Sequence, residues 1–240
     1  MAWYRESFGE EYLELYAHRD RGEAARHVAF LEELFGDRRP RAVLDLACGA
    51  GRHTAALRAR GYRALGVDLS LTLLALGDGL PRVAGDMRRL PFADAAFDWV
   101  LNVFTSFGYF ESERENFRVL EQIVRVLEPH GGFLIDLMNL DATLAKLKEY
   151  ELREEPGGRR VEIYRGWDER ARRINKRIRV CETGREPRTF LESVRVYTAD
   201  EVTIGLRWAG LEVTHLFGSF AGEPYDRDSE RLILVGHKVA

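Results

Sequence analysis

Cysteine and long apolar runs are both scarce in this chain of 240 residues. Its two cysteines, Cys48 and Cys181, lie far apart with no second pair, which excludes a disulfide framework and gives no indication of a zinc site or other metal site. No apolar run approaches the length needed to cross a membrane, and the first six residues, MAWYRE, are unlike a signal peptide. We therefore expect no membrane partner and a reducing, cytoplasmic setting.

A strong excess of charge is also absent, because 36 basic and 39 acidic side chains leave a formal net charge of −3. This balance gives no electrostatic reason to expect the whole chain to bind nucleic acid. Arginine supplies nearly all the positive charge, and the few lysines are Lys146, Lys148, Lys176 and Lys238. The length suits one α/β domain with an embellishment, or two small domains, and 45% hydrophobic residues are ample for a core.

What the chain does contain is a strand-and-glycine motif at residues 43–51, VLDLACGAG. Its apolar residues predict a short, buried parallel strand. Gly49 and Gly51 then break the strand, and a helical stretch over 52–60 ends at Gly61. A strand, a glycine turn and a helix N-terminus together let the backbone approach a ligand closely.

A third glycine is missing from this turn, because Thr54 stands where a dinucleotide fingerprint requires glycine. Its absence counts against NAD, although a protein that binds a nicotinamide dinucleotide stays open as an alternative. Asp68 follows the next apolar run, Ala64 to Val67. An acidic residue at the end of the second strand is where a ribose hydroxyl pair is usually held. Asp68 is therefore predicted to bind a ribose.

The chain alternates regularly between strand and helix patterns. Strands are expected near 42–46, 63–67, 81–84, 97–103 and 132–138, with helices near 52–60, 70–76 and 114–127. A capping box at Thr198 to Glu201 starts a helix that ends at Gly210, and strands near 211–217 and 231–238 follow. These units predict a parallel sheet covered on both faces, with ligands bound at the carboxyl ends of the strands.

Four stretches, in this order, resemble a known family. Residues 43–51 resemble motif I of the class I S-adenosylmethionine-dependent methyltransferases, with Asp45 as its acidic residue. Asp68, Gly85-Asp86 and the Pro129 to Gly132 turn match later features of that family. We identify the chain as a member, of the type that acts on small molecules. The resemblance implies an α/β fold with a doubly wound, mostly parallel, seven-stranded Rossmann-like sheet, helices on both faces and an antiparallel last strand.

The resemblance also implies which residues bind S-adenosyl-L-methionine. Asp86 is expected to accept a hydrogen bond from the adenine amino group, with Met87 packed on the ring, although Asp86 could instead be a turn residue beside Gly85. Asn102 is expected to face the methionine part of the cofactor. The full set of expected cofactor-binding residues is Tyr16, Asp45, Ala47, Gly49, Gly51, Asp68, Leu69, Asp86, Met87 and Asn102.

Before the first strand, residues 6–35 have apolar residues at helical spacing. They make up most of a predicted N-terminal helical cap, residues 1–36, which could close over the strand ends. Tyr16 is expected at the cofactor because an aromatic residue of this segment often contacts it in related methyltransferases. Tyr12 is expected to pack in the core instead.

Residues 151–197 change character, because 161–164, 173–180 and 190–197 alternate apolar and polar side chains with a period of two. We expect an antiparallel β insertion, separate from a methyltransferase domain of residues 1–150 and 198–240. It would overhang the cofactor edge as a lid or form the surface of a homodimer. Its arginine-rich stretch 170–179 could bind RNA phosphates. Acidic residues flank that stretch without an aromatic stacking pattern, so we favour a solvated strand face.

The expected reaction is direct in-line transfer of the cofactor's methyl group to a nucleophile. Alignment of the reactants can supply on the order of 7–11 kcal/mol, so no dedicated catalytic residue is required, and Tyr109 is the candidate for an acid–base or orienting role. His53 and His130 are expected at a helix cap or the surface, and Cys48 as a small buried residue. The aromatic loop 104–110 favours an enclosed small-molecule acceptor. A cofactor-binding regulatory protein without turnover and an RNA-directed methyltransferase stay as alternatives.

Overall fold

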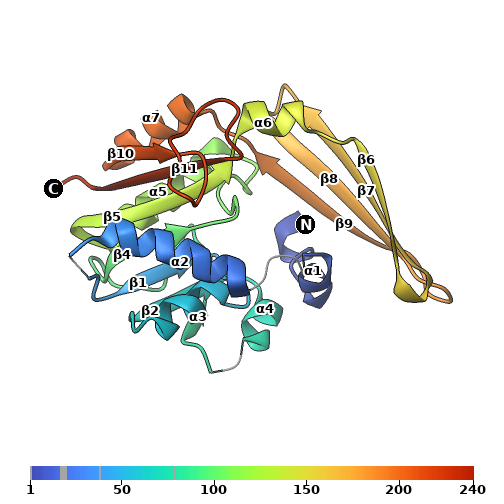
Figure 1. Cartoon of the computed structure of the whole chain (residues 1–240), viewed down its shortest axis with the longest axis horizontal. Coiled ribbons are helices and arrows are strands. Elements are labelled where there is room, and N and C mark those ends of the chain that lie inside the picture. Colours follow the sequence, from blue (N-terminus) through green and yellow to red (C-terminus); the bar gives the residue numbers. More distant parts are fainter. Residues whose placement is uncertain (1, 17–20, 38, 78) are drawn as a thin grey trace.

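A computed structural model of the chain describes residues 2–16, 21–37, 39–77 and 79–240. Within these residues, one seven-stranded sheet has the order β10-β11-β5-β4-β1-β2-β3, and a separate four-stranded sheet has the order β6-β7-β8-β9 (Figure 1). The strands of the larger sheet are β1 (Val43–Leu46), β2 (Ala64–Asp68), β3 (Arg82–Ala84), β4 (Phe97–Asn102), β5 (Leu127–Met138), β10 (Leu211–Phe217) and β11 (Arg231–Lys238). Strands β1 to β5 run parallel, whereas β11 is antiparallel to β5 and β10. The predicted Rossmann-like sheet is confirmed.

Helices cover both faces of the seven-stranded sheet, as predicted. On one face, α2 and α3 bury Val28 and Leu57 against β1 and β4. On the other face, α5 and α7 bury Ile123 and Leu206. The helices are α1 (Glu10–Leu15), α2 (Arg21–Phe35), α3 (Arg52–Ala59), α4 (Leu71–Leu76), α5 (Glu113–Val126), α6 (Leu140–Ala145) and α7 (Ala199–Ala209). The resulting strand–helix units gather the carboxyl ends of β1 to β4 at one edge.

The N-terminal cap divides into two parts with different places in the fold. The 3-10 helix η1 (Trp3–Arg5) and α1 lie between the two sheets, near the carboxyl ends of the parallel strands (Figure 1). Helix α2 instead packs on the face of the large sheet, where Ala24, Val28 and Leu31 are buried along one stripe. Only the first part of the cap therefore covers the strand ends.

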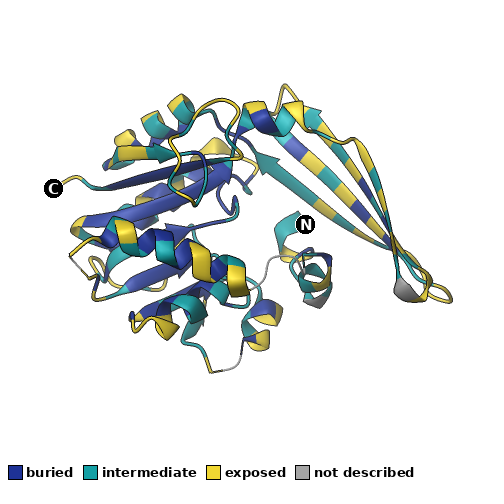
Figure 2. Cartoon of the chain, viewed as in Figure 1, coloured by how far each residue is buried: buried dark blue, intermediate teal, exposed yellow. Residues whose placement is uncertain are grey.

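The antiparallel sheet is the predicted insertion, with one strand more than the sequence indicated. It contains β6 (Tyr150–Glu155), β7 (Arg159–Asp168), β8 (Arg173–Cys181) and β9 (Arg188–Arg195), and the short 3-10 helix η2 (Pro156–Gly158) links the first two. Strand β6 escaped sequence analysis because its sequence, YELREE, has a single aliphatic residue and places charge on both faces. Alternation of more buried and exposed residues is clear along β7 and β8, whereas β9 alternates only over its first half (Figure 2).

The two sheets are joined through the loop after β4. Arg195 of β9 donates its backbone N–H to the carbonyl of Gly108 at 2.9 Å. The guanidinium of Arg173 on β8 donates to the carbonyls of Phe110 at 3.0 Å and Tyr109 at 3.2 Å. The aromatic loop is therefore shaped by the insertion and is not independent of it.

The described part of the chain has neither a membrane-spanning helix nor a cluster of metal-binding side chains. None of its helices is long and apolar enough to cross a membrane. Among the same residues, no group of three histidine, cysteine or acidic side chains is placed to hold a metal ion.

Candidate functional site

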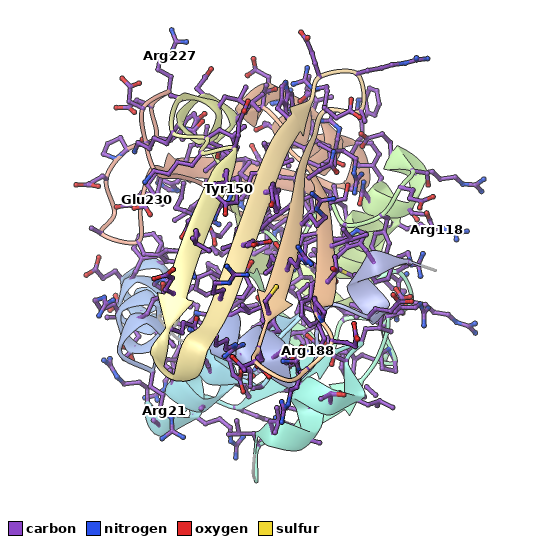
Figure 3. All side chains as sticks on the ribbon, turned by 90° about the vertical axis from the view of Figure 1, so that its right-hand side faces the viewer. Arg21, Arg118, Tyr150, Arg188, Arg227 and Glu230 are labelled. Carbon is purple, nitrogen blue, oxygen red and sulfur yellow. The ribbon has the colours of Figure 1, made fainter. Side chains whose placement is uncertain are left out.

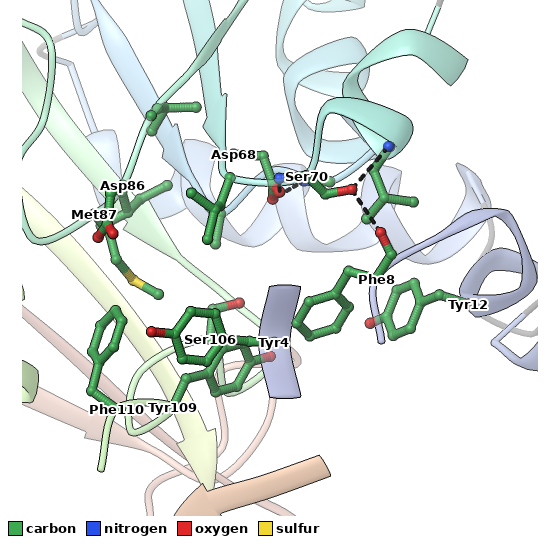
Figure 4. A pocket seen from close by; sticks show the side chains of 17 residues that line it. Tyr4, Phe8, Tyr12, Asp68, Ser70, Asp86, Met87, Ser106, Tyr109 and Phe110 are labelled. Carbon is green, nitrogen blue, oxygen red and sulfur yellow. Dashed lines mark hydrogen bonds between the residues drawn. The ribbon is translucent and has the colours of Figure 1, made fainter. Parts of the chain in front are cut away.

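A cleft lies at the carboxyl ends of β1, β2 and β3, where the sequence motifs meet (Figure 4). It encloses about 660 Å³, including its open mouth. Strand ends form one side, and the N-terminal segment with the loop after β4 forms the other. The lining includes Ala47, Gly49, Asp68, Leu69, Asp86 and Met87 on the strand side, and Tyr4, Phe8, Tyr12, Ser106, Tyr109 and Phe110 on the opposite side.

The carboxylate of Asp68 holds the glycine turn in place. Its Oδ2 accepts the backbone N–H of Gly49 at 2.8 Å, and its Oδ1 accepts the backbone N–H of Ser70 at 2.8 Å. Gly49 has a φ of +55°, a left-handed conformation that favours glycine. Burial raises the pKa of Asp68. Each carboxylate oxygen has a second lone pair, so Asp68 can also accept hydroxyl donors in the cleft that it lines.

Asp45 lies behind the glycine turn and is only 1% exposed. Its Oδ2 accepts the backbone N–H of Thr54 at 2.9 Å and the hydroxyl of Thr54 at 2.7 Å. Thr54, which stands where a dinucleotide fingerprint has its third glycine, thus links the first turn of α3 to β1. Burial raises the pKa of Asp45 from 3.8 to about 6. Its Oδ1 has no hydrogen-bond partner among the described residues.

Asn102, at the end of β4, has a second unsatisfied side-chain oxygen. Its Nδ2 donates to the carbonyl of Leu46 at 3.2 Å, while its buried Oδ1 has no partner in the described parts of the chain. Asp45 also borders a small pocket that shares Ala47 and Gly49 with the cleft. Buried acceptors of this kind normally have donors, and the ammonium group of a methionine moiety would be one. The residues present therefore fit the cofactor that the motif implies.

Asp86 and Met87 line the cleft where β3 ends. The Asp86 carboxylate accepts the backbone N–H of Arg88 at 2.9 Å and its guanidinium at 2.6 Å, and its own carbonyl accepts the N–H of Arg89 at 2.8 Å. Burial opposes ionisation, but these bonds from Arg88 prevail and lower the pKa of Asp86. Asp86 is thus a turn residue and also lines the cleft.

The expected cofactor residues divide into three groups in space. The first group lines the cleft and consists of Ala47, Gly49, Asp68, Leu69, Asp86 and Met87. Asp45 and Asn102 lie behind the glycine turn, and Gly51 starts α3 as its N-cap, with a φ of +85°. Tyr16 lies outside the cleft, in a second cavity.

Sequence analysis missed the aromatic residues of the N-terminal segment. Tyr4, Phe8 and Tyr12 line the cleft, and Tyr12 was expected in the core. Phe8 stacks on Tyr109 with ring centroids 5.7 Å apart, and the hydroxyl of Ser70 donates to the Phe8 carbonyl at 2.6 Å. A signal existed in the sequence, because an aromatic residue stands at every fourth position from Tyr4 to Tyr16.

The second cavity adjoins the cleft on the side of the antiparallel sheet and encloses about 1390 Å³, including its mouth. Its walls come from the N-terminal segment, the loop after β4, α6 and the inner face of the antiparallel sheet. Phe8, Tyr12 and Tyr109 line both spaces. We call these three rings the shared wall. Tyr109 accordingly lies between the two spaces, where both reactants of a transfer reaction could reach it.

Burial changes the protonation of Cys48 and His53. Burial raises the pKa of the Cys48 thiol, which keeps it protonated and unreactive. His53 is 4% exposed, and its Nε2 lies 3.1 Å from Nδ1 of His27. The expectation of a cap or surface position for His53 was wrong, because α2 covers this end of α3. Burial lowers the pKa of His53 well below its ordinary value, which keeps it neutral.

Comparison with known proteins agrees with this geometry. A family model described as a methyltransferase domain matches residues 43–131. The cypemycin N-terminal methyltransferase of a Streptomyces species is 31% identical over 206 residues, which cover 81% of this chain and 82% of that protein.

Solved structures share the fold. The CcbJ methyltransferase from Streptomyces caelestis has a TM-score of 0.78 at 22% identity and covers 90% of each chain. CalS10, an amino pentose methyltransferase from Micromonospora echinaspora in a structure with bound S-adenosylmethionine, has a TM-score of 0.71 at 21% identity and covers 96% of this chain and 97% of its own.

Proposed function

This chain belongs to the S-adenosylmethionine-dependent methyltransferases, and from that premise we propose that it methylates a small molecule held in the second cavity. The observation that supports the proposal is the shared wall of Phe8, Tyr12 and Tyr109, at which the cofactor cleft and the second cavity meet. Methyl transfer requires donor and acceptor in direct line. Two spaces that adjoin at one wall suit that requirement.

The cleft residues have distinct proposed roles toward the cofactor. Asp68 would accept the ribose hydroxyls, in addition to the two backbone N–H groups that it already binds. Asp86 would accept the adenine amino group, with Met87 against the ring. Asp45 and Asn102 would receive the ammonium group through their unpartnered oxygens. Ala47, Gly49 and Leu69 would contact the cofactor along the strand ends, as they line the cleft.

S-adenosyl-L-methionine is the methyl donor of this family and, when bound, supplies a methyl group activated by positive charge on sulfur. The chain's own contribution is to align the acceptor and to exclude water with aromatic rings. Tyr109, which lines both spaces, would orient the acceptor at the shared wall. Glu151 of the second cavity is a poor base, because hydrogen bonds from Arg153 and Arg165 lower its pKa to about 2.

A small acceptor is supported by the dimensions of the second cavity and by two relatives. The names of those relatives give cypemycin and an amino pentose as their acceptors. RNA is less favoured, because the arginines of the insertion are used within the protein: Arg173 binds loop carbonyls, Arg177 lies over the Tyr164 ring, and Arg179 pairs with Glu162. We include a cytoplasmic location in this proposal, since both cysteines are free thiols. A homodimer stays a prediction.

Calorimetric titration with S-adenosylmethionine, S-adenosylhomocysteine and NAD tests the cofactor site. We expect binding of the first two only, followed by methyl transfer to members of a panel of small amines and phenols. Cofactor binding without turnover on any acceptor would favour the regulatory alternative. Binding of NAD alone would overturn the proposal.

A further inference from the structure

A row of four charged side chains crosses the inner face of the antiparallel sheet. Arg165 of β7 is the register partner of Lys176 on β8, and Lys176 is the register partner of Glu192 on β9. Glu151 of β6 completes the row through an ion pair with Arg165 at 2.7 Å. All four residues line the second cavity. We call Glu151, Arg165, Lys176 and Glu192 the charged row.

The charged row lies between two apolar rows of the inner face. On one side, Ile163, Ile178 and Phe190 form the neighbouring row, and the first two are almost fully buried. On the other side, Ile174 and Val194 are paired across β8 and β9. The other end of that face carries Arg153, Arg159 and Arg188, each in ion pairs of its own. Placing charges in such a face has a desolvation cost. The row therefore points to a ligand and not to sheet stability.

The order of charge along the row is unusual, because two cations stand side by side at its centre. Like charges directly opposite each other on neighbouring strands are destabilising. On its outer flank each cation pairs with a carboxylate, Arg165 with Glu151 at 2.7 Å and Lys176 with Glu192 at 3.7 Å. The side chains of Arg165 and Lys176 are 20% and 15% exposed, so solvent screens their mutual repulsion weakly.

Further cations surround the same cavity. Lys146 and Lys148 line it at the turn before β6, so this one cavity holds all but one of the few lysines of the chain. Arg231 lines it too, but is paired with the buried Asp136 at 2.7 Å. The additional acidic lining residue is Glu230, beside the edge of the sheet that begins at Tyr150 (Figure 3). The electrostatic bias of the cavity is therefore positive.

We propose that the methyl acceptor is an anionic small molecule whose carboxylate or phosphate group binds between Arg165 and Lys176. An anion at that point converts the row into alternating charges and removes the repulsion at its centre. Tyr16 assists as a positioning residue, because its hydroxyl donates to Glu192 at 2.6 Å and contacts the Lys176 ammonium, which fixes both side chains. This inference rests on the proposed function, since it takes the second cavity as the acceptor site.

The scarcity of lysine makes the test direct. Protein labelled with ¹³C at lysine Cε gives one signal for each of Lys146, Lys148, Lys176 and Lys238. Inorganic phosphate or acetate is added to protein saturated with S-adenosylhomocysteine, at constant ionic strength with chloride. We expect the Lys176 signal to shift saturably, whereas the Lys238 signal, from the far end of β11, stays unchanged.

Matched variants locate the anion. Arg165→Gln is expected to weaken binding of the same anion about tenfold or more, as for loss of a charged contact. Arg177→Gln is the control. Arg177 follows Lys176 in sequence but lies over the Tyr164 ring on the outer face, so this variant is expected to bind the anion with unchanged affinity. Saturation by phosphate alone assigns a phosphorylated acceptor, and saturation by acetate assigns a carboxylate.

Equal, non-saturating shifts of Lys176 and Lys238, or equal affinity in Arg165→Gln and wild type, would overturn the inference. The wild-type measurement stands by itself if Arg165→Gln fails to fold. A separate titration of S-adenosylhomocysteine shows whether the cofactor site works. Failure of the proposed function is thereby distinguished from failure of the anion site.

Discussion

The two sheets build their halves of the site in different ways. In the parallel sheet, Asp68 and Asp86 each end or directly follow a strand, so the topology alone brings them together. In the antiparallel sheet, Lys176 and Glu192 meet only because β8 and β9 pair in one particular register. The cofactor side therefore depends on local motifs, and the acceptor side depends on strand register.

The largest expected effect comes from breaking the joint between the two sheets. Arg173→Met removes the guanidinium that binds the carbonyls of Phe110 and Tyr109 and of Ser193, the last at 2.6 Å. Leaving such carbonyls unsatisfied is expected to lower the free energy of unfolding by about 3 kcal/mol. Urea denaturation measures the change. Arg170→Met, an exposed neighbour, is the control, and an equal loss in both variants would contradict the assigned role.

A smaller effect is expected from a substitution that changes the cofactor half of the site and not the acceptor half. Asp68→Ala is expected to weaken binding of S-adenosylhomocysteine by about 2 kcal/mol, because a charged acceptor is lost and the Gly49 and Ser70 N–H groups are released. Calorimetry gives the dissociation constant. Phosphate binding at the charged row should be unaffected in the same variant. Unchanged cofactor affinity would remove the ribose assignment.

The pH dependence of cofactor binding tests Asp45. Its pKa is about 6 in the folded chain, so the carboxylate is mostly ionised at pH 7 and mostly protonated at pH 5. We expect the affinity for S-adenosylhomocysteine to fall about tenfold, or about 1.4 kcal/mol, over that range, because the partner of the ammonium group is neutralised. Asp45→Asn should bind weakly at both pH values. A wild-type affinity independent of pH would contradict this role.

The same pKa shift has the opposite sign for the stability of the ligand-free protein. The folded pKa of Asp45 lies above its ordinary value of 3.8, so between about pH 4 and 6 the folded state binds more protons than the unfolded state. The contribution of Asp45 to stability is therefore present at low pH and lost as the pH rises through 6. The buried histidines also make stability depend on pH. The difference in unfolding free energy between wild type and Asp45→Asn, measured across this pH range, separates the contribution of Asp45 from theirs.

The smallest expected effect concerns the N-terminal segment, which both sheets hold. Ser70→Ala removes the α4 N-cap and the bond to the Phe8 carbonyl, and Ser7→Ala removes the bond from Ser7 to the Leu191 carbonyl of β9 at 2.7 Å. Each should cost about 1 kcal/mol. Hydrogen exchange of α1 measures the loosening. Faster exchange in only one variant would show that a single sheet holds the segment.

Much of the cofactor half could be predicted from the sequence. Leu46, Ala47 and Gly49 of the motif line one cleft together with Asp68 and Asp86, because parallel strands and short turns fix strand-end residues locally. Tyr16 was expected at the cofactor and Tyr12 in the core, but Tyr12 lines the cleft and Tyr16 only the second cavity. Both belong to one aromatic series, which does not show which ring faces the cleft. Which of them meets the cleft depends on how α1 docks between the sheets.

The acceptor half was much less predictable. Lys176 was part of an arginine-rich stretch that resembled a solvated face, and Arg177 and Arg179 do lie on the outer face. The period-two pattern puts Lys176 on the same face as Ile174, Ile178 and Val180. It leaves the strand pairing undetermined, and that pairing sets Lys176 beside Arg165 and Glu192. Strand β6 was missed for a related reason, because Glu151 and Arg153 point inward to ion pairs and not to an apolar core.

The position of β11 has a consequence for the synthesis of the chain. Strand β5 leaves the ribosome long before β11, its neighbour in the sheet, and the whole antiparallel sheet and α7 emerge between them. Until Arg231 arrives, the fully buried Asp136 of β5 lacks its cation, and one edge of the strand is open. The insertion, built from consecutive hairpins, can form early. The cofactor sheet must wait for residues 231–238 before it is complete.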